Sequence, residues 1–318
     1  MSYWRQKSVL VTGGRGFLGR AVCRLLEEAG CRRLVAVGRA EADLCRQEET
    51  ERLMHRERPD VVVHLAGSGR GIADHLAGPA RDAYANLAMG LHVVEAARIS
   101  GVEKLVYVAS ADAYPRRVQP PYRETQLWEG LPDPSHAAYG IAKRAMHIVL
   151  EAYRRQYGLK SAYLVSTNLY GPGADFTEGR AHVVAALVRR FCEAAERGAE
   201  EVVCWGTGSA TRDFLYVDDA AVAVLRAGER IDAPAPINIA SGTEVSIGRL
   251  AETIAALCGY QGRIRFDPSK PEGPKRRCLD VARARRLLDF QPTVGLEEGL
   301  RRTIAWWRAT RPSAAVVP

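Results

Sequence analysis

Two short stretches of the chain carry side chains that can move a proton to or from a substrate oxygen. YGIAK places Tyr139 and Lys143 four positions apart, which makes them neighbours on one face of a helix. An ammonium beside a phenol favours the phenolate and lowers its pKa from about 10. Ser110, in YVASADAYP, ends a predicted strand and can hydrogen-bond the same oxygen. These residues predict hydride transfer at a carbinol or ketone, with Tyr139 handling the proton.

A glycine pattern near the start of the chain indicates where the hydride carrier binds. VTGGRGFLG places Gly13, Gly16 and Gly19 directly after a predicted strand and at the start of a predicted helix. In that setting the first glycine turns tightly, the second lets the backbone approach a pyrophosphate, and the third packs helix against strand. We therefore predict a dinucleotide site, with contacts from Gly13, Arg15, Gly16, Phe17, Leu18, Gly19, Arg39, Asp43, Leu44, Leu65, Ala66, Gly67, Tyr139 and Lys143.

The residues at the end of the second predicted strand indicate whether the dinucleotide is NAD or NADP. An acidic residue there serves the ribose hydroxyls of NAD, whereas arginine suits the 2′-phosphate of NADP. Arg39 lies at this position and Arg15 lies inside the glycine loop, so two guanidiniums favour NADP. The alternative is that Arg39 is a solvated loop residue, that Glu41 serves the ribose, and that the cofactor is NAD.

The elements that must position these groups alternate along the first half of the chain. Between residues 8 and 108, short β-branched runs alternate with helical periodicity, which is typical of βαβ units and a parallel sheet. We predict an α/β fold, a Rossmann-type doubly wound parallel sheet with a smaller C-terminal α/β domain. Residues 1–170, with parts of about 215–240, form the cofactor domain, and residues 171–318 form most of the substrate domain, with an interleaved boundary.

Composition narrows the class of partner. The formal net charge of +8 suits anionic small molecules, and no basic run is interleaved with aromatic residues, so we expect no nucleic acid. The seven cysteines show no spacing suited to zinc, and we expect no metal. Because the chain has neither the apolar region of a signal peptide nor a long apolar run, we expect a cytoplasmic protein that does not bind a membrane.

These motifs together resemble the extended short-chain dehydrogenases/reductases, in particular the NAD(P)-dependent nucleotide-sugar epimerase/dehydratase family. TNLYGPGADF, VVCWGTGSATRDFLYVDD and INIASGTEVSI are similar, in order and spacing, to the GDP-L-fucose synthases of that family. The resemblance implies a nucleotide-diphosphate sugar as substrate, GDP as its nucleotide, and a homodimer built on two long helices. It further implies catalysis by Ser110, Tyr139, Lys143 and His182, and substrate contacts from Asn168, Arg190, Trp205, Arg212 and Arg277.

One residue departs from that family pattern. GDP-L-fucose synthases carry a cysteine two residues after the serine, where it acts as the base of the epimerisation, and this chain has Asp112. An Asp112 whose pKa is raised by burial can remove a proton next to a ketone. Alternatively, Asp112 is ionised and only hydrogen-bonds a sugar hydroxyl. Tyr114, two residues further, is expected to pack beside the sugar.

Three functions follow from these motifs. The leading expectation is an NADP-dependent reductase or epimerase-reductase of a nucleotide-linked 4-keto-6-deoxy sugar. The second is a redox-neutral NAD(P)-dependent C4-epimerase or dehydratase. A third, of another class, is a non-catalytic NADP-binding regulator, against which the intact Ser110, Tyr139 and Lys143 argue.

Overall fold

A central sheet of six parallel strands organises the protein. The computed structural model describes residues 2–69, 72–270 and 272–311. Hydrogen bonds connect the six strands in the order β2-β1-β3-β4-β5-β9. Their bounds are β1 Ser8–Thr12, β2 Arg33–Val37, β3 Val61–His64, β4 Lys104–Ser110, β5 Lys160–Ser166 and β9 Pro236–Ile239. The predicted Rossmann-type fold is confirmed.

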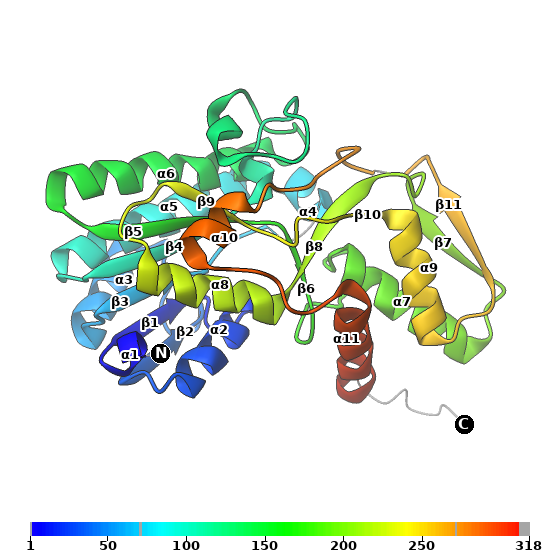
Figure 1. Cartoon of the computed structure of the whole chain (residues 1–318), viewed down its shortest axis with the longest axis horizontal. Coiled ribbons are helices and arrows are strands. Elements are labelled where there is room, and N and C mark those ends of the chain that lie inside the picture. Colours follow the sequence, from blue (N-terminus) through cyan, green and yellow to red (C-terminus); the bar gives the residue numbers. More distant parts are fainter. Residues whose placement is uncertain (1, 70–71, 271, 312–318) are drawn as a thin grey trace.

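Helices cover both faces of this sheet (Figure 1). Side chains alternate along each strand, so Val9 and Val11 pack on one face and Leu10 on the other. The first face is covered by α2 (Phe17–Glu28) and α8 (Val217–Arg230), and α10 (Ala282–Leu288) adds to it. The second is covered by α3 (Gln47–Glu57), α5 (Pro79–Ile99) and α6 (Ala137–Tyr157). Burial on both faces explains why the strands read as nearly continuous apolar runs.

A second lobe lies beyond the sheet, to the right in Figure 1. It contains the three-stranded sheet β10-β8-β6 and the parallel pair β11-β7. Its helices share one apolar core. The bounds are β6 Asn168–Tyr170, α7 Val183–Arg197, β7 Glu201–Trp205, β8 Thr211–Tyr216, β10 Glu244–Ser246, α9 Ile247–Cys258, β11 Arg263–Asp267 and α11 Leu296–Thr310.

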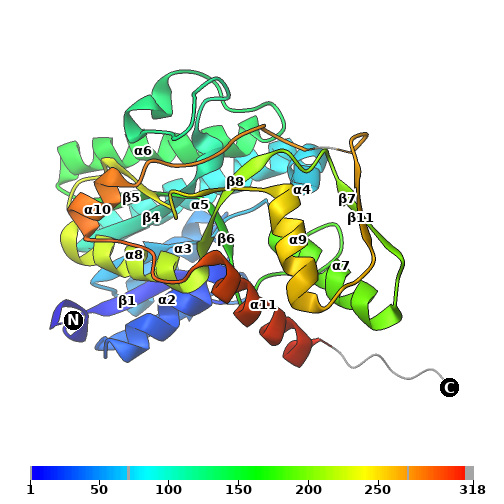
Figure 2. The ribbon, with the colours of Figure 1, turned by 45° about the vertical axis from the view of Figure 1, so that its right-hand side comes forward.

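Short helical segments complete the chain. They are α1 Ser2–Arg5, α4 Ile72–Ala77, and two 3-10 turns, η1 Ala111–Ala113 and η2 Glu124–Trp128. Figure 2 shows α4 on the side of the sheet that faces the second lobe. None of the helices in the described part of the chain is both long and apolar enough to span a membrane.

Two elements differ from what the sequence predicts. The apolar pattern of residues 83–101 predicts a helix there, but α5 begins earlier, at Pro79, because proline suits the first helical position, where no backbone N–H is needed. The apolar run of residues 160–172 predicts one strand, but it divides at Thr167 into β5 and β6. There the Thr167 N–H donates to the carbonyl of Ile239 and its hydroxyl to that of Asp213, at 3.2 and 3.0 Å. The chain thereby passes from the central sheet to the second lobe within one residue.

Asn238, in β9, ties three segments together in the buried core. Its amide nitrogen donates to the carbonyls of Tyr122 and Asp280 at 2.9 and 3.0 Å. Its side-chain oxygen accepts from the hydroxyl of Tyr114 at 2.7 Å, and its backbone N–H donates to Glu124. Asn238 and Tyr114 are both buried. Tyr114 is therefore a member of the core network, whereas the sequence places it beside a sugar.

We predict that Asn238→Ala lowers the free energy of unfolding by about 3 kcal/mol, because it removes three side-chain hydrogen bonds and leaves the buried Tyr114 hydroxyl without its acceptor. Tyr114→Phe removes one of these hydrogen bonds and should cost about 1 kcal/mol. Urea denaturation of the two variants measures both values. Equal losses would contradict the network.

Candidate active site

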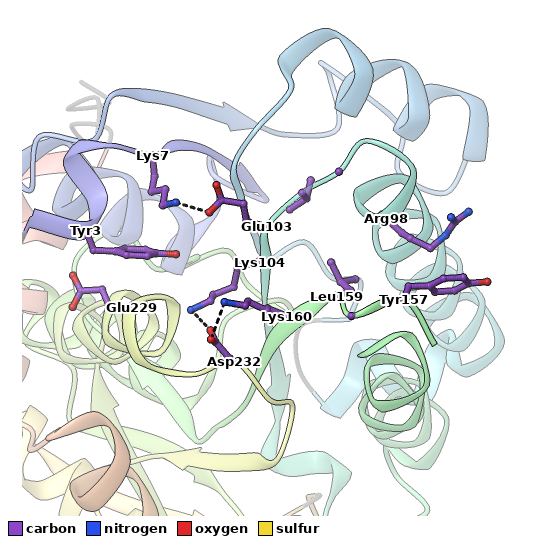
Figure 3. A pocket seen from close by; sticks show the side chains of 13 residues that line it. Tyr3, Lys7, Arg98, Glu103, Lys104, Tyr157, Leu159, Lys160, Glu229 and Asp232 are labelled. Carbon is purple, nitrogen blue, oxygen red and sulfur yellow. Dashed lines mark hydrogen bonds and ion pairs between the residues drawn. The ribbon is translucent and has the colours of Figure 1, made fainter. Parts of the chain in front are cut away.

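The carboxyl ends of the central strands hold the residues that can do chemistry. A cavity of about 600 Å³ lies at the opposite end, where β4 and β5 begin (Figure 3). Its lysines already have acidic partners, since Lys104 and Lys160 contact Asp232 at 2.6 and 3.1 Å. In open α/β sheets, ligands bind beyond the carboxyl ends of the strands. The candidate site is therefore at the end where Ser110 lies.

The structure brings Ser110, Tyr139 and Lys143 together. Ser110 is the last residue of β4, and the other two lie in the first turns of α6, which packs on η1. Tyr139 and Ser110 share a side-chain hydrogen bond. The Lys143 ammonium lies 5.9 Å from the centre of the Tyr139 ring. The predicted adjacency is confirmed, and each catalytic role stays a prediction.

The predicted lowering of the pKa of Tyr139 is wrong, because this pKa lies above its ordinary value. Burial raises the pKa of Tyr139 above its ordinary value, and the negative charge of Asp112 raises it further. The hydrogen bond with Ser110 lowers it only in part. Burial also lowers the pKa of Lys143 to about 8, because a buried ammonium loses its hydration. At neutral pH Tyr139 therefore carries its proton, which makes it a proton donor.

Asp112 forms a buried cluster with Arg277 and His136. One carboxylate oxygen accepts from the Arg277 guanidinium at 2.5 Å and lies 3.4 Å from His136 Nε2. The other accepts from the Ser110 hydroxyl at 3.1 Å. Burial opposes the charge, but the Arg277 guanidinium, together with the electrostatic influence of His136, outweighs it and holds the pKa of Asp112 well below its usual range. The hypothesis of an Asp112 with a raised pKa is therefore wrong. Asp112 is ionised and orients Ser110.

The glycine turn has the shape of a phosphate cradle. Gly13 has a φ of +66°, and a Cβ on Gly19 would lie 2.1 Å from the carbonyl oxygen of Gly13, so helix α2 can approach the strand only with glycine there. Gly16 is the N-cap of α2, whose first turn contains no acidic residue. The amide groups at this helix end suit a dinucleotide pyrophosphate. Phe17 and Leu18 open α2 beside it.

The residues at the end of β2 suit an additional phosphate. The side chains of Arg15 and Arg39 are 66% and 90% exposed, so their donors can reach a ligand. Glu41 accepts from Arg15 at 2.7 Å and from the backbone N–H of Gly38 at 2.7 Å. The acid that could serve an NAD ribose is thus already hydrogen-bonded. Asp43 and Leu44 precede α3, and Leu65, Ala66 and Gly67 follow β3.

The predicted substrate residues divide into separate groups. Trp205 ends β7 with a largely exposed side chain, and the Arg190 guanidinium carbon lies 6.0 Å from its ring centre. An exposed indole beside an arginine can bind a flat or apolar ligand face. Asn168 donates to the carbonyl of Asp213 at 3.1 Å.

The half-buried Arg212 and the buried Arg277 form a second group. The guanidinium of Arg212 donates to the carbonyls of Thr211, Pro274 and Glu272 at 2.6–2.9 Å. Burial and the charge of Arg277 lower the pKa of Arg212 to about 10. Arg212 therefore holds the segment that delivers Arg277 to Asp112. Its contact with a diphosphate stays a prediction.

His182 lines a cavity of about 440 Å³ together with Gly16, Phe17 and Arg180. It occupies the N-cap position of α7, but its side chain makes no capping hydrogen bond. The cavity joins the end of the cofactor cradle to the second lobe. This places His182 at the junction of the two predicted sites, and its catalytic role stays a prediction.

Sequence reasoning missed three buried residues around Tyr139. His136 precedes the catalytic helix and contacts both Asp112 and Arg277. His75, in α4, packs its ring on Tyr139, and Asp82 holds that ring. His136 lies three residues before Tyr139, a spacing that puts both near the start of one helix and could have revealed it. His75 and Asp82 follow β3 in a segment with no recognisable motif.

We predict that Lys143→Met stabilises the protein at pH 7, by up to about 3 kcal/mol, because the folded state no longer buries an ammonium. The folded pKa of Lys143 is about 8 and its ordinary value is 10.5, so the unfolded chain holds the proton more tightly. The wild-type cost is therefore full below pH 8 and disappears as the pH rises to about 10.5.

Urea denaturation across this pH range measures the difference between wild type and variant. The exposed Lys275→Met is the matched control and should leave that difference near zero. A Lys143→Met variant that is less stable than wild type at pH 7 would contradict the prediction.

Comparison with known proteins identifies the family to which the chain belongs. The model of the NAD dependent epimerase/dehydratase family matches residues 9–240. The chain is 38% identical to GDP-L-fucose synthase 1 of Arabidopsis thaliana over 303 residues, 95% of this chain and 94% of that protein. Among solved structures, a GDP-6-OMe-4-keto-L-xylo-heptose reductase from Campylobacter jejuni superposes with a TM-score of 0.91 at 26% identity, covering 96% and 99% of the two chains.

A second Campylobacter jejuni structure, the GDP-mannoheptose C4 reductase MlghC with NADP bound, superposes with a TM-score of 0.86 at 27% identity. It covers 96% of this chain and 99% of its own. The likeness thus extends over both lobes and includes the second-lobe motifs. On the family match and this likeness, the chain belongs to the NAD dependent epimerase/dehydratase family.

Proposed function

We propose that this protein reduces the 4-keto group of a GDP-linked 4-keto-6-deoxy sugar with NADPH. The observation that carries the proposal is the buried Tyr139, which holds its proton and is hydrogen-bonded with Ser110. Reduction of a ketone requires a proton donor at the oxygen, and a neutral phenol supplies one. The likeness to GDP-L-fucose synthases and to GDP-sugar reductases supports the choice of substrate.

Each residue of the site has a separate proposed role in this reaction. NADPH, when bound, supplies the hydride that C4 receives. Tyr139 hydrogen-bonds O4 and gives it a proton, and Ser110, whose own proton goes to Asp112, positions the Tyr139 hydroxyl. Lys143, beside Tyr139, stabilises the phenolate that this transfer leaves. Asp112 keeps the Ser110 hydroxyl oriented, because its carboxylate accepts a hydrogen bond from that hydroxyl.

The choice of NADP rests on the cradle and on the two arginines near the end of β2. Arg15 and Arg39 are the exposed cations there, and a 2′-phosphate suits forked donors. The NADP that MlghC binds supports the same choice. Trp205 and Arg190 are proposed to contact the nucleotide part of the substrate.

We predict that the purified protein oxidises one NADPH for each GDP-4-keto-6-deoxymannose consumed, and uses NADH less well. Tyr139→Phe should lower kcat by about 10²–10⁴-fold, because it removes the proton donor. Loss of NADPH absorbance and chromatography of the sugar nucleotide measure both. Tyr157→Phe, at the exposed end of the same helix, is the matched control.

Conversion of a sugar nucleotide without NADPH consumption would instead indicate a redox-neutral epimerase. No conversion of any 4-keto sugar nucleotide, with NADPH still bound, would favour the non-catalytic regulator. Both results contradict the proposed reductase.

We also propose a homodimer through α5 and α6. These helices pack against each other and expose large apolar side chains, Tyr84 and Leu91 from α5 and Ile141 and Ile148 from α6. A self-complementary apolar face of two neighbouring helices suits a two-fold axis. The dimer implied by the family resemblance uses the same helices.

We predict that the double variant Leu91→Glu, Ile148→Glu is monomeric, because it places charges on both helices of this face. Analytical ultracentrifugation measures the mass. Leu131→Glu changes an exposed leucine outside the two helices and should leave the dimer intact. A wild-type monomer would refute the proposal.

A further inference from the structure

His75 lies against the face of the proposed proton donor. Its ring centre is 4.7 Å from that of Tyr139, with 36° between the planes. The imidazole is buried, and it comes from α4, an element that carries none of the predicted catalytic residues. The His75 ring is titratable and contacts Tyr139. It therefore lies near the place where the 4-keto oxygen of the substrate would accept the proton of Tyr139.

Asp82 fixes the orientation of this ring. One carboxylate oxygen lies 2.9 Å from His75 Nδ1, and Asp82 is fully buried. The other oxygen accepts from the Ser68 hydroxyl at 3.1 Å. Because a carboxylate accepts a proton from Nδ1, a neutral His75 carries its hydrogen there and has its lone pair on Nε2. This pairing of acid and imidazole is the arrangement of a general base.

The loop before α4 is shaped around the imidazole. A Cβ on Gly69 would lie 2.3 Å from Cε1 of His75, and Gly69 has a φ of +99°. A larger residue at this position would displace the ring. The close approach shows that the loop backbone, and not only Asp82, holds His75 in place.

Asp112 and His75 differ in their availability for proton transfer. Both lie near Tyr139: the ring of His75 packs on it, and the charge of Asp112 raises its pKa. Asp112 is engaged by Arg277, His136 and Ser110. His75 is paired with a carboxylate through Nδ1, which fixes the tautomer that carries the lone pair on Nε2.

We propose that His75, oriented by Asp82, exchanges a proton with a carbon next to the 4-keto group and so performs the task that Asp112 cannot. This inference rests on the proposed substrate class. Nε2 takes the proton from C3 or C5, the C–H electron pair forms the enolate, and the Tyr139 hydroxyl hydrogen-bonds its oxygen. Return of a proton to the carbon restores the ketone, and the histidine is regenerated without any oxidant or reductant.

Solvent exchange tests the proposal independently of reduction. GDP-4-keto-6-deoxymannose is incubated with the protein and NADP⁺ in D₂O, without NADPH, and deuterium at C3 and C5 is measured by NMR and mass spectrometry. Wild type should incorporate deuterium. His75→Phe keeps an aromatic ring beside Tyr139 and should lower the exchange rate by about 10²-fold or more. Asp82→Asn should lower it by at least tenfold.

Parallel assays with NADPH separate a catalytic from a structural role. The ratio of deuterium incorporated to NADPH consumed should fall in His75→Phe and Asp82→Asn and stay unchanged in His92→Phe, a histidine of α5 that contacts the carbonyl of Leu44. An unchanged ratio in both His75→Phe and Asp82→Asn overturns the proposal.

Two further results are decisive. Reduction by wild type without any deuterium uptake overturns the role of His75 and leaves the proposed function standing. Exchange that persists in His75→Phe and disappears in Asp112→Asn assigns the base to Asp112 instead. Thermal unfolding of each variant checks that it folds, and Asp82→Asn provides the test if His75→Phe does not.

Discussion

The buried ion pair between Asp112 and Arg277 is the interaction on which the site depends. It joins the end of β4 to a segment 165 residues later in the chain. Asp112 in turn holds Ser110, and His136 contacts both members of the pair. Removing one partner of such a pair typically costs about 3–5 kcal/mol, because the other charge stays buried. Ser110 is therefore correctly oriented only when the segment that carries Arg277 has packed against the end of β4.

This dependence explains which features of the site the sequence could predict. The glycine turn and the Tyr139–Lys143 adjacency depend on residues a few positions apart, so local patterns are sufficient. The pKa of Asp112 depends on Arg277, a distant residue whose contact no periodicity reveals. The pKa of Tyr139 depends mainly on how completely the fold buries it, which the spacing of Tyr139 and Lys143 does not reveal.

The main features of the fold could also be predicted from local patterns. Apolar strands that alternate with helices indicate a parallel sheet, because the helices cover both of its faces and both faces of each strand must then be apolar. The division of one apolar run into β5 and β6 was not predictable, since both pieces have the same residue pattern and differ only in their hydrogen-bond partners. Tyr114 likewise follows a catalytic-looking motif, and only the distant Asn238 shows that it belongs to the core.

The place of β9 in the central sheet bears on how the chain folds during synthesis. β5 ends at Ser166, and its outer neighbour begins only at Pro236, after β6, α7, β7 and β8 of the second lobe have been made. At about 5–20 residues per second, a nascent chain exposes an unpaired parallel edge for several seconds. Such edges invite pairing with other chains. The emerging protein is thus most vulnerable to aggregation during that interval, and chaperone binding there would protect the sheet that later carries Ser110.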